Sequence, residues 1–299
     1  MLAYLNGEFL PADQVRVSPF DRGFLFADGV YEAVRSGPAL AGKTGPRFVG
    51  MNRHVRRLTR SLGELRIDFD ARELARVSAE LVKRSGIEQA LIYFQVTRGA
   101  PDLATQPARS HTPPAGMKPT VFAFVRPAAV VDFQNPTPLI KKCVTLPDLR
   151  WHRCDIKSIS LLGNALASRG AADAGADEAV LLREAPGGEK TLSEGALTNV
   201  LVVTSKGELV TPPLETNTVL PGITREILLD LEPSIRQGAV SERELREARE
   251  VMLLGTTAAV TSVTQLDGKP VGGGTPGPVA QRLAVVLARA ILEGREDIG

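Results

Sequence analysis

Short runs of β-branched and aromatic residues, interrupted by a few helical stretches, constrain the fold of this chain more than any other feature. Asn6-Gly7, within residues 3–9, predicts a hairpin because this dipeptide suits a tight turn. Further strands are predicted at residues 92–96, 120–125, 141–146, 179–182, 199–203, 251–254 and 260–263. Apolar residues at helical spacing predict helices at residues 53–65, 71–84, 159–174 (with Ser158 as its cap) and 279–292. This mixture predicts an α/β fold.

A change in composition divides the chain into two parts. Residues 127–137 are mostly small, polar or proline, which is typical of a linker between domains. We therefore expect a small N-terminal α/β domain at residues 1–126, a linker at 127–137 and a larger C-terminal domain at 138–299. The 299 residues, of which 43% are hydrophobic, suffice for two packed cores.

Charge and cysteine content exclude several classes of function. The 36 basic and 34 acidic residues are interleaved, which argues against nucleic acid and membrane surfaces as partners. No apolar run approaches the roughly 20 residues of a membrane helix, and no signal peptide is evident, so we expect a cytoplasmic protein. Cys143 and Cys154 are too few for a disulfide framework and lack metal-ligand spacing, so we expect two buried thiols and no metal.

Many common catalytic chemistries lack their motifs. The three histidines are His54, His111 and His152, and there is no HExxH, GxSxG, P-loop or GxGxxG pattern. Metal-assisted hydrolysis, Ser/His/Asp catalysis and dinucleotide binding are therefore poorly supported.

Lys157 follows a segment of cationic, aromatic and apolar residues, 150–156, just before a predicted helix. Desolvation and neighbouring positive charge both favour the neutral amine, and a neutral amine can form an imine with a carbonyl compound. Taken alone, a surface lysine whose stem lies on apolar neighbours is the commoner reading.

Four blocks give this lysine a context, and together they resemble the fold-type IV pyridoxal-phosphate (PLP) enzymes, with D-amino acid aminotransferases as the nearest likeness. The blocks are residues 21–32 (DRGFLFADGVYE), 92–99 (IYFQVTRG), 150–162, and 191–199 with Thr191-Leu192-Ser193-Glu194-Gly195. The resemblance spans nearly the whole chain. It implies a small N-terminal α/β domain and a larger domain with a β-barrel-like sheet and helices. It also implies PLP as the cofactor, Lys157 as the Schiff-base lysine and proton carrier, and Glu194 as the carboxylate that faces the pyridine nitrogen.

The same resemblance implies a binding site for the cofactor phosphate. Arg57 matches the family's phosphate arginine, and a guanidinium can meet two oxygens at once. Its neighbours Arg53 and Arg56 are expected to be exposed helix charges. The turn at 220–225 and the Gly255-Thr256-Thr257 segment supply the other expected contacts, namely Leu220, Ile223, Thr224, Thr256 and Thr257.

Substrate handedness depends, in such enzymes, on the groups that bind the substrate carboxylate. The resemblance assigns this role to Tyr31 and to an Arg-x-His pair on a loop of the partner subunit, which implies a homodimer with shared active sites. Counting back from Lys118 aligns the pair with Arg109 and His111, whereas counting forward from Gly99 places Leu103 and Thr105 there instead. The loop is longer than the family pattern, and we favour Arg109 and His111 since loop insertions are inexpensive. Arg35 is a reserve cation near the substrate entrance.

The implied activity is exchange of the amino group between a D-amino acid, such as D-alanine, and a 2-oxo acid, 2-oxoglutarate or pyruvate, by a ping-pong route. Aminodeoxychorismate lyase and branched-chain L-amino acid aminotransferase activities are the alternatives on the same fold. A non-catalytic binding protein would be expected to have lost Lys157 or Glu194, and both are present. The sequence does not identify the preferred side chain or the pathway.

Overall fold

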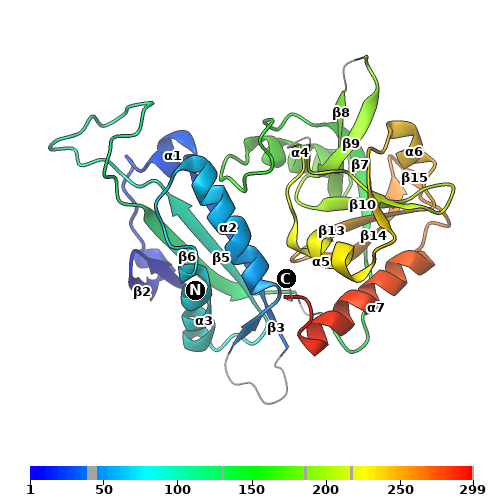
Figure 1. Ribbon diagram of the computed structural model, residues 1–299, viewed down its shortest axis with the longest axis horizontal. Helices are drawn as coiled ribbons and strands as arrows, with labels where there is room; N and C mark the ends of the chain where they lie inside the picture. Colours follow the sequence, from blue (N-terminus) through cyan, green and yellow to red (C-terminus); the bar gives the residue numbers. More distant parts are fainter. Residues whose placement is uncertain (39–45, 130, 185–186, 216–217, 298–299) are drawn as a thin grey trace. The chain divides into compact units, whose positions relative to one another are not determined.

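The computed structural model describes residues 1–38, 46–129, 131–184, 187–215 and 218–297. These residues form two compact units, which are described separately (Figure 1). The first unit contains residues 1–130 together with Ile156–Ser160, and the second contains Val131–Asp155 and the chain from Leu161 onward. The predicted linker thus includes the change of unit, although its bounds and those of the two domains remain predictions, and residue 130 lies outside the described residues.

The first unit contains an antiparallel sheet covered on one face by two helices (Figure 1). The strands, in spatial order, are β2 (Glu8–Pro11), β1 (Leu2–Leu5), β6 (Thr120–Pro127), β5 (Ala90–Thr97), β3 (Gly29–Gly37) and β4 (Arg47–Phe48). The helices are α1 (Arg22–Phe26), α2 (Met51–Leu65), α3 (Glu73–Ser85) and the short 3-10 helix η1 (Ala12–Gln14). The hairpin prediction is confirmed, with Asn6 and Gly7 both at positive φ in the β1–β2 turn.

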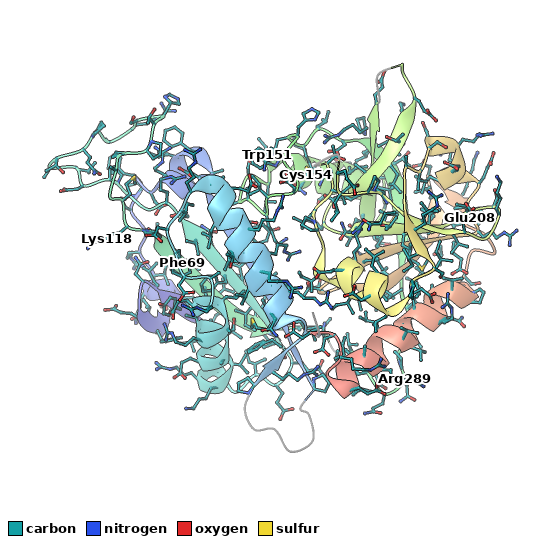
Figure 2. All side chains as sticks on the ribbon, viewed as in Figure 1. Phe69, Lys118, Trp151, Cys154, Glu208 and Arg289 are labelled. Carbon is teal, nitrogen blue, oxygen red and sulfur yellow. The ribbon has the colours of Figure 1, made fainter. Side chains whose placement is uncertain are left out.

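Strand alternation and helical spacing place the same set of apolar residues in one core. Alternate residues of β3, β5 and β6 meet one stripe of α2 and one of α3, and Phe69 packs its ring 6.1 Å from Phe94 (Figure 2). Fully buried members include Val34, Leu58, Leu74, Leu81, Ile92 and Phe94. Burial of each such side chain contributes about 1.5–3 kcal/mol.

The second unit is built on a larger mixed sheet, curled into a half-barrel. Its strands, in spatial order, are β12 (Ile235–Gln237), β11 (Leu209–Thr211), β10 (Asn199–Val203), β13 (Glu250–Gly255), β14 (Ala259–Leu266), β7 (Leu139–Pro147), β8 (Glu178–Glu184) and β9 (Lys190–Gly195), with β15 (Lys269–Pro270) beside β14. The helices are α4 (Leu162–Asp173), α5 (Ile223–Leu231), α6 (Glu242–Arg246) and α7 (Pro278–Glu293). The expected α/β architecture with a barrel-like second sheet is confirmed.

Two local expectations are wrong. Helix α4 starts at Leu162, and Ser158 does not cap it but forms a bridge with Val30 of β3. Arg53 is not an exposed charge: only 3% of it is accessible, because it lies one helical turn before the buried Arg57 on the same face of α2. Arg56 is exposed as expected.

The two cysteines are buried and free, as predicted. Burial raises the pKa of the Cys143 thiol to about 12 and that of Cys154 to about 11, so both stay protonated at neutral pH. The Cys154 thiol donates to the carbonyl of Trp151, its neighbour in Figure 2. Among the described residues, every helix is too short or too polar to cross a membrane.

Candidate active site

The segment that carries Lys157 lies along β3 in the first unit. The Tyr31 N–H donates to the Lys157 carbonyl at 3.0 Å, the Ile159 N–H donates to the Gly29 carbonyl at 3.1 Å, and the Lys157 N–H donates to Ser61 Oγ at 3.2 Å. This pairing explains why residues 156–160 belong to the first unit although the chain on both sides belongs to the second. The backbone at the lysine is therefore fixed from two elements, β3 and α2.

Tyr31 and Lys157, which the sequence assigned to different roles, lie in contact. The Lys157 ammonium nitrogen Nζ is 4.2 Å from the centroid of the Tyr31 ring. Tyr31 in turn stacks on Tyr93, with 5.5 Å between the ring centroids. The aromatic face beside this amine limits the directions in which the lysine stem can point.

Arg57 is held by a carboxylate that the sequence analysis did not identify. Its Nε and Nη2 donate to the two oxygens of Glu32 at 2.8 and 2.7 Å, which is a bidentate ion pair. His54, one turn earlier on α2, lies 2.6 Å from Glu32 Oε2 through Nδ1. Since a carboxylate oxygen only accepts, Nδ1 carries a proton in this contact. All three side chains are buried.

Charge balance in this cluster favours the ionised acid. Burial alone would raise the pKa of Glu32, but Arg57 and His54 together outweigh it and hold that pKa well below its usual range. Burial lowers the pKa of His54 despite the attraction of Glu32, so the ring is neutral at neutral pH. The cluster therefore presents a fixed guanidinium on α2 beside the strand that carries Tyr31.

Arg109 and His111 lie together on the long loop between β5 and β6. The Arg109 guanidinium carbon is 4.9 Å from the centre of the Phe26 ring, and the His111 ring is 5.5 Å from it. Both side chains are exposed. Leu103 and Thr105, the alternative pair, are exposed as well, but the Thr105 hydroxyl donates to Asp102 inside the loop.

Arg35 lies apart from these groups. It is on β3 and buried, and it donates to the carbonyl of Ala129 and, at 3.4 Å, to Gln89. Burial lowers its pKa. Gln89 and Ala129 thus hold it at the opposite end of β3 from Tyr31, and the role of a substrate cation remains a prediction.

Glu194, in the second unit, is a buried carboxylate at the end of β9. It pairs with Arg150, and its Oε2 accepts from Asn199 Nδ2 at 2.9 Å and from the Leu220 N–H at 3.1 Å. Asn199 Nδ2 also donates to the Leu220 carbonyl at 2.9 Å. These bonds connect Glu194 directly to the turn that leads into α5.

Arg150 serves two acids at once. It forms a bidentate pair with Asp148, through Nε and Nη2 at 2.9 Å each, while its Nη1 meets Glu194. Arg183 and the Ser193 hydroxyl also donate to Asp148. Burial raises the pKa of Glu194 by more than Arg150 lowers it, whereas the pKa of Asp148 is lowered because its bonds to Arg150, Ser193 and Arg183 exceed the effect of burial.

The start of α5 offers backbone donors for an anion. Gly222 is the N-cap and supplies no side-chain cap to the first turn, where Ile223 and Thr224 lie. A Cβ on Gly222 would lie 1.8 Å from Asn199 Oδ1, so only glycine allows this close approach. Thr256 and Thr257 form the turn after β13, and Gly255 lies against Thr198, the neighbour of Asn199. The second unit thus joins Glu194 to Leu220 and the start of α5 through Asn199, while Thr256 and Thr257 follow a glycine that lies against the neighbour of Asn199.

This donor set fits pyridoxal phosphate. The cofactor needs an amine for its carbonyl, a carboxylate opposite its pyridine nitrogen and donors for its phosphate. Lys157 supplies an amine. Glu194 is a buried acid whose pKa is raised, because burial raises it by more than the positive charge of Arg150 lowers it. Gly222 and the first turn of α5 supply anion donors within two hydrogen bonds of that acid.

Several residues that shape these clusters were not assigned from sequence, notably Glu32, His54, Asp148 and Arg150. The sequence could have identified Glu32. It lies between Val30 and Val34 at a spacing of two, so the three side chains share the core face of a strand, where a charge needs a buried partner. Arg150 lies in the block that carries Lys157, but nothing in its sequence neighbourhood indicates a partner at position 194.

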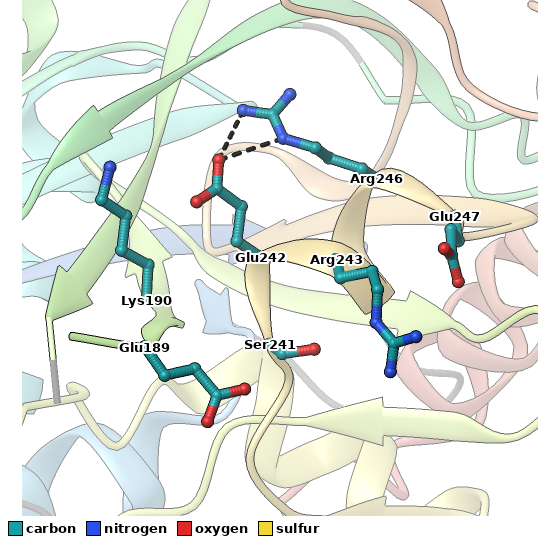
Figure 3. A pocket seen from close by; sticks show the side chains of 7 residues that line it. All are labelled: Glu189, Lys190, Ser241, Glu242, Arg243, Arg246 and Glu247. Atoms are coloured by element: carbon teal, nitrogen blue, oxygen red, sulfur yellow. Dashed lines mark hydrogen bonds and ion pairs between the residues drawn. The ribbon is translucent and has the colours of Figure 1, made fainter. Parts of the chain in front are cut away.

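A surface groove of about 500 Å³ lies elsewhere in the second unit (Figure 3). It is lined by Glu189, Lys190, Ser241, Glu242, Arg243, Arg246 and Glu247. Arg246 is already paired with Glu242 at 2.7 Å, and charges of both signs alternate around the groove. It includes none of the predicted site residues.

Comparisons with known proteins agree with these features. Residues 29–266 match the model of the family "Amino-transferase class IV". The chain is 35% identical to the D-alanine aminotransferase of Staphylococcus haemolyticus over 94% of both proteins, and 34% identical to that of Bacillus licheniformis over 98% of both.

Solved structures show the same fold. A branched-chain aminotransferase of Thermoproteus uzoniensis, in a complex with norvaline, superposes with a TM-score of 0.79 at 25% identity, covering 99% of this chain and 96% of that one. The branched-chain amino acid aminotransferase of Escherichia coli gives 0.79 at 25% identity over 94% and 91%. The chain therefore belongs to the class IV aminotransferases, which use pyridoxal phosphate.

Proposed function

We propose that this aminotransferase acts on D-amino acids, exchanging the amino group between a D-amino acid such as D-alanine and 2-oxoglutarate or pyruvate. The relatives named D-alanine aminotransferase support this substrate class, since they match over nearly the full length of the chain. A ping-pong route follows from the cofactor, which stores the amino group between two half-reactions.

The contact between Lys157 and Tyr31 is the observation that carries this proposal. Transamination needs the lysine amine at the substrate Cα, while the hand of the substrate depends on where its carboxylate is held. A tyrosine whose ring centroid lies 4.2 Å from the lysine Nζ is placed to hold a carboxylate close to that amine. The backbone hydrogen bond between the two residues, which keeps them side by side, supports this role.

Each cofactor contact then has a role. Bound pyridoxal phosphate supplies an electron sink for the electrons of the broken Cα–H bond. Lys157 would hold the cofactor through Nζ and would move the proton to and from the substrate Cα. Glu194 keeps a proton on the pyridine nitrogen. The other predicted contacts would bind the cofactor phosphate or form the turns around it. They are Arg57, Leu220, Ile223, Thr224, Thr256 and Thr257.

Arg109 and His111 complete the carboxylate site in this proposal, acting on the active site of a second copy of the chain. Their common position on Phe26 supports this pair over Leu103 and Thr105, of which the Thr105 hydroxyl is bonded to Asp102 within the loop. Arg35 is assigned a reserve role at the substrate entrance.

We propose a homodimer and a cytoplasmic location. The face of the first sheet opposite α2 and α3 carries the stacked rings of Tyr31, Tyr93 and Phe124, which are only partly buried. Such an aromatic face favours a protein partner. The two free thiols fit a reducing compartment.

Two other activities fit the fold. The branched-chain aminotransferases among the solved structures support an L-enzyme by fold alone, whereas the full-length relatives named D-alanine aminotransferase favour the D-enzyme. An aminodeoxychorismate lyase would release pyruvate without needing a 2-oxo acid as acceptor.

A spectroscopic comparison tests the proposal. The purified holoenzyme should be yellow, and D-alanine should convert the visible absorbance to that of the pyridoxamine form, while L-alanine does so poorly. An equal response to L-leucine would assign the branched-chain activity, and pyruvate release without an acceptor would assign the lyase activity.

Lys157→Ala should abolish the covalent colour and lower turnover by more than about a thousandfold, since it removes both the imine and the proton carrier. Lys83→Ala, a change at a lysine in the last turn of α3, is the matched control and should leave both unchanged. Colour and turnover that survive in Lys157→Ala would overturn the assignment.

A further inference from the structure

Residues 99–119 form a loop that is closed at its base. Thr97 and Thr120 are paired at the ends of β5 and β6. Gly99 has φ of +89°, and a Cβ on it would lie 1.9 Å from the Lys118 carbonyl oxygen (Lys118 is labelled in Figure 2), so the two arms meet there. The Arg22 N–H donates to the Gly99 carbonyl at 2.9 Å. The base is therefore fixed against the start of α1.

Arg22 also reaches the middle of this loop. Its Nη1 donates to the carbonyl of Ser110 at 2.5 Å and its Nη2 to the carbonyl of His111 at 3.1 Å. In the described part of the chain, no other hydrogen bond joins residues 100–118 to the rest of the first unit. Figure 1 shows α1 beside this loop. The position of the segment that contains Arg109 and His111 thus depends on one guanidinium.

The guanidinium is itself fixed on its remaining side. Arg22 Nε donates to Asp28 Oδ2 at 2.8 Å, and the Arg22 side chain is only 7% exposed. Asp28 also binds Arg98, at the base of the loop, through both carboxylate oxygens. Burial would raise the pKa of Asp28, but the two arginines outweigh it and lower that pKa. Asp28 thus binds both Arg98, at the base of the loop, and Arg22, which holds the middle of the loop.

Phe26, one helical turn after Arg22 on α1, provides the surface beneath. The guanidinium carbons of Arg22 and Arg109 lie 4.6 and 4.9 Å from its ring centroid, and the His111 ring lies 5.5 Å away. Arg109 and His111 thus approach the same ring, and the Arg22 bonds to the carbonyls of residues 110 and 111 hold the backbone between and beside them.

We propose that Arg22 is a positioning residue for substrate recognition: by holding the Ser110 and His111 carbonyls, it orients Arg109 and His111 for the substrate carboxylate. This inference rests on the proposed function, in which those two side chains bind the carboxylate. Arg22 does not itself contact the substrate. Without the Arg22 guanidinium the loop is released. Substrate binding then becomes weaker, because the Arg109 and His111 side chains must be ordered each time a substrate binds.

Arg22→Met tests this proposal in the holoenzyme. We expect KM for D-alanine to rise about tenfold with kcat nearly unchanged, since the loss falls on binding of the carboxylate. Arg22→Lys should restore only part of the affinity, because an ammonium lacks the fork that meets two carbonyls and Asp28 together. Arg16→Met is the matched control, since Arg16 also donates to backbone carbonyls, those of Asp13 and Val15, but outside the loop. It should leave KM unchanged.

Phe26→Leu gives a second test that leaves the ion pair between Arg22 and Asp28 intact. It removes the aromatic surface under Arg109 and His111 and should raise KM about threefold. This variant decides the matter if Arg22→Met does not fold. If Arg22→Met does not fold, an unchanged KM in Phe26→Leu would overturn the proposal.

A double-mutant cycle separates the failure of this inference from failure of the proposed function. If Arg109→Met/His111→Gln leaves KM for D-alanine unchanged, the carboxylate site is wrong and the positioning role falls with it. If that variant raises KM but Arg22→Met does not, only the positioning role is overturned. If Arg22→Met raises KM equally in both backgrounds, Arg22 acts elsewhere and the inference is again overturned. We expect almost no further effect in the double-variant background.

Discussion

Glu32 and Glu194 are both buried, and each is paired with an arginine, yet their pKa values are displaced in opposite directions. Glu32 forms a bidentate pair with Arg57 and has a second donor in His54. Glu194 shares Arg150 with Asp148, which takes two of the guanidinium's bonds. Burial therefore does not decide the charge of an acid in this protein; the share of positive charge that it receives does.

This difference agrees with the proposal, in which Glu32 has a structural role and Glu194 a role beside the cofactor. Glu32 is compensated within its own cluster and fixes the direction of Arg57. Glu194 is undercompensated, and a buried acid of this kind favours a further cation beside it. In the proposed function, the protonated pyridine nitrogen of the cofactor would be that cation.

Glu194→Gln is expected to give the largest effect of the changes that probe this comparison. An amide cannot keep a proton on the pyridine nitrogen, so kcat should fall about a thousandfold, equivalent to about 4 kcal/mol, in steady-state assays. Glu250→Gln is the control, since Glu250 is a buried acid of the same unit that accepts from the first turn of α7. If both variants lose activity equally, the special place of Glu194 is lost.

Glu32→Gln should instead lower the free energy of unfolding, by about 3 kcal/mol at pH 7, because it removes the carboxylate from a buried ion pair. Urea unfolding of the cofactor-free protein measures this. The exposed acid Glu80, paired with Arg84 on α3, offers the control, and Glu80→Gln should change unfolding little.

The pH dependence of the two variants should be opposite. A lowered folded pKa means that the stabilisation by Glu32 is present above the unfolded value of about 4.3 and is lost as the pH falls through the folded value. A raised folded pKa means that the contribution of Glu194 is complete below about 4.3 and is lost as the pH rises through its folded value. Glu32→Gln should thus lower the free energy of unfolding most at neutral pH, where Glu194→Gln should lower it little. Parallel pH profiles would break the comparison.

Ser193→Ala should produce the smallest of these effects. The Ser193 hydroxyl donates to Asp148 Oδ2 at 2.8 Å, and its loss should lower the free energy of unfolding by about 1 kcal/mol while kcat is retained. Ser78→Ala is the control, because the buried Ser78 hydroxyl has no hydrogen-bond partner among the residues described. An equal loss in both variants would show that the bond to Asp148 contributes nothing.

The sequence predicted those features that depend on local pattern. Alternation and helical spacing located the β1–β2 hairpin and α2, and the resemblance supplied the family and the cofactor. The same alternation could have identified Glu32, since a charge between Val30 and Val34 on a core face requires a partner.

Other features depend on contacts between distant parts of the chain. Ser158 has the composition of a helix cap, but its pairing with Val30, far earlier in the chain, decides its structure. Arg22 lies in a recognised block, yet its hold on Ser110 and His111 depends on how a lengthened loop folds back. The local structural propensity of a residue does not depend on partners that are distant in sequence. The roles of Ser158 and Arg22 therefore become visible only in the folded structure.

The pairing of residues 156–160 with β3 makes the first unit discontinuous in sequence. A fragment that ended at residue 130 would keep the helices and the sheet but would lose the peptide that occupies the Tyr31 N–H and the Gly29 carbonyl. Separate expression of the two halves would therefore divide the first unit from its own lysine, so the boundary visible in composition is not a place where this enzyme can be cut.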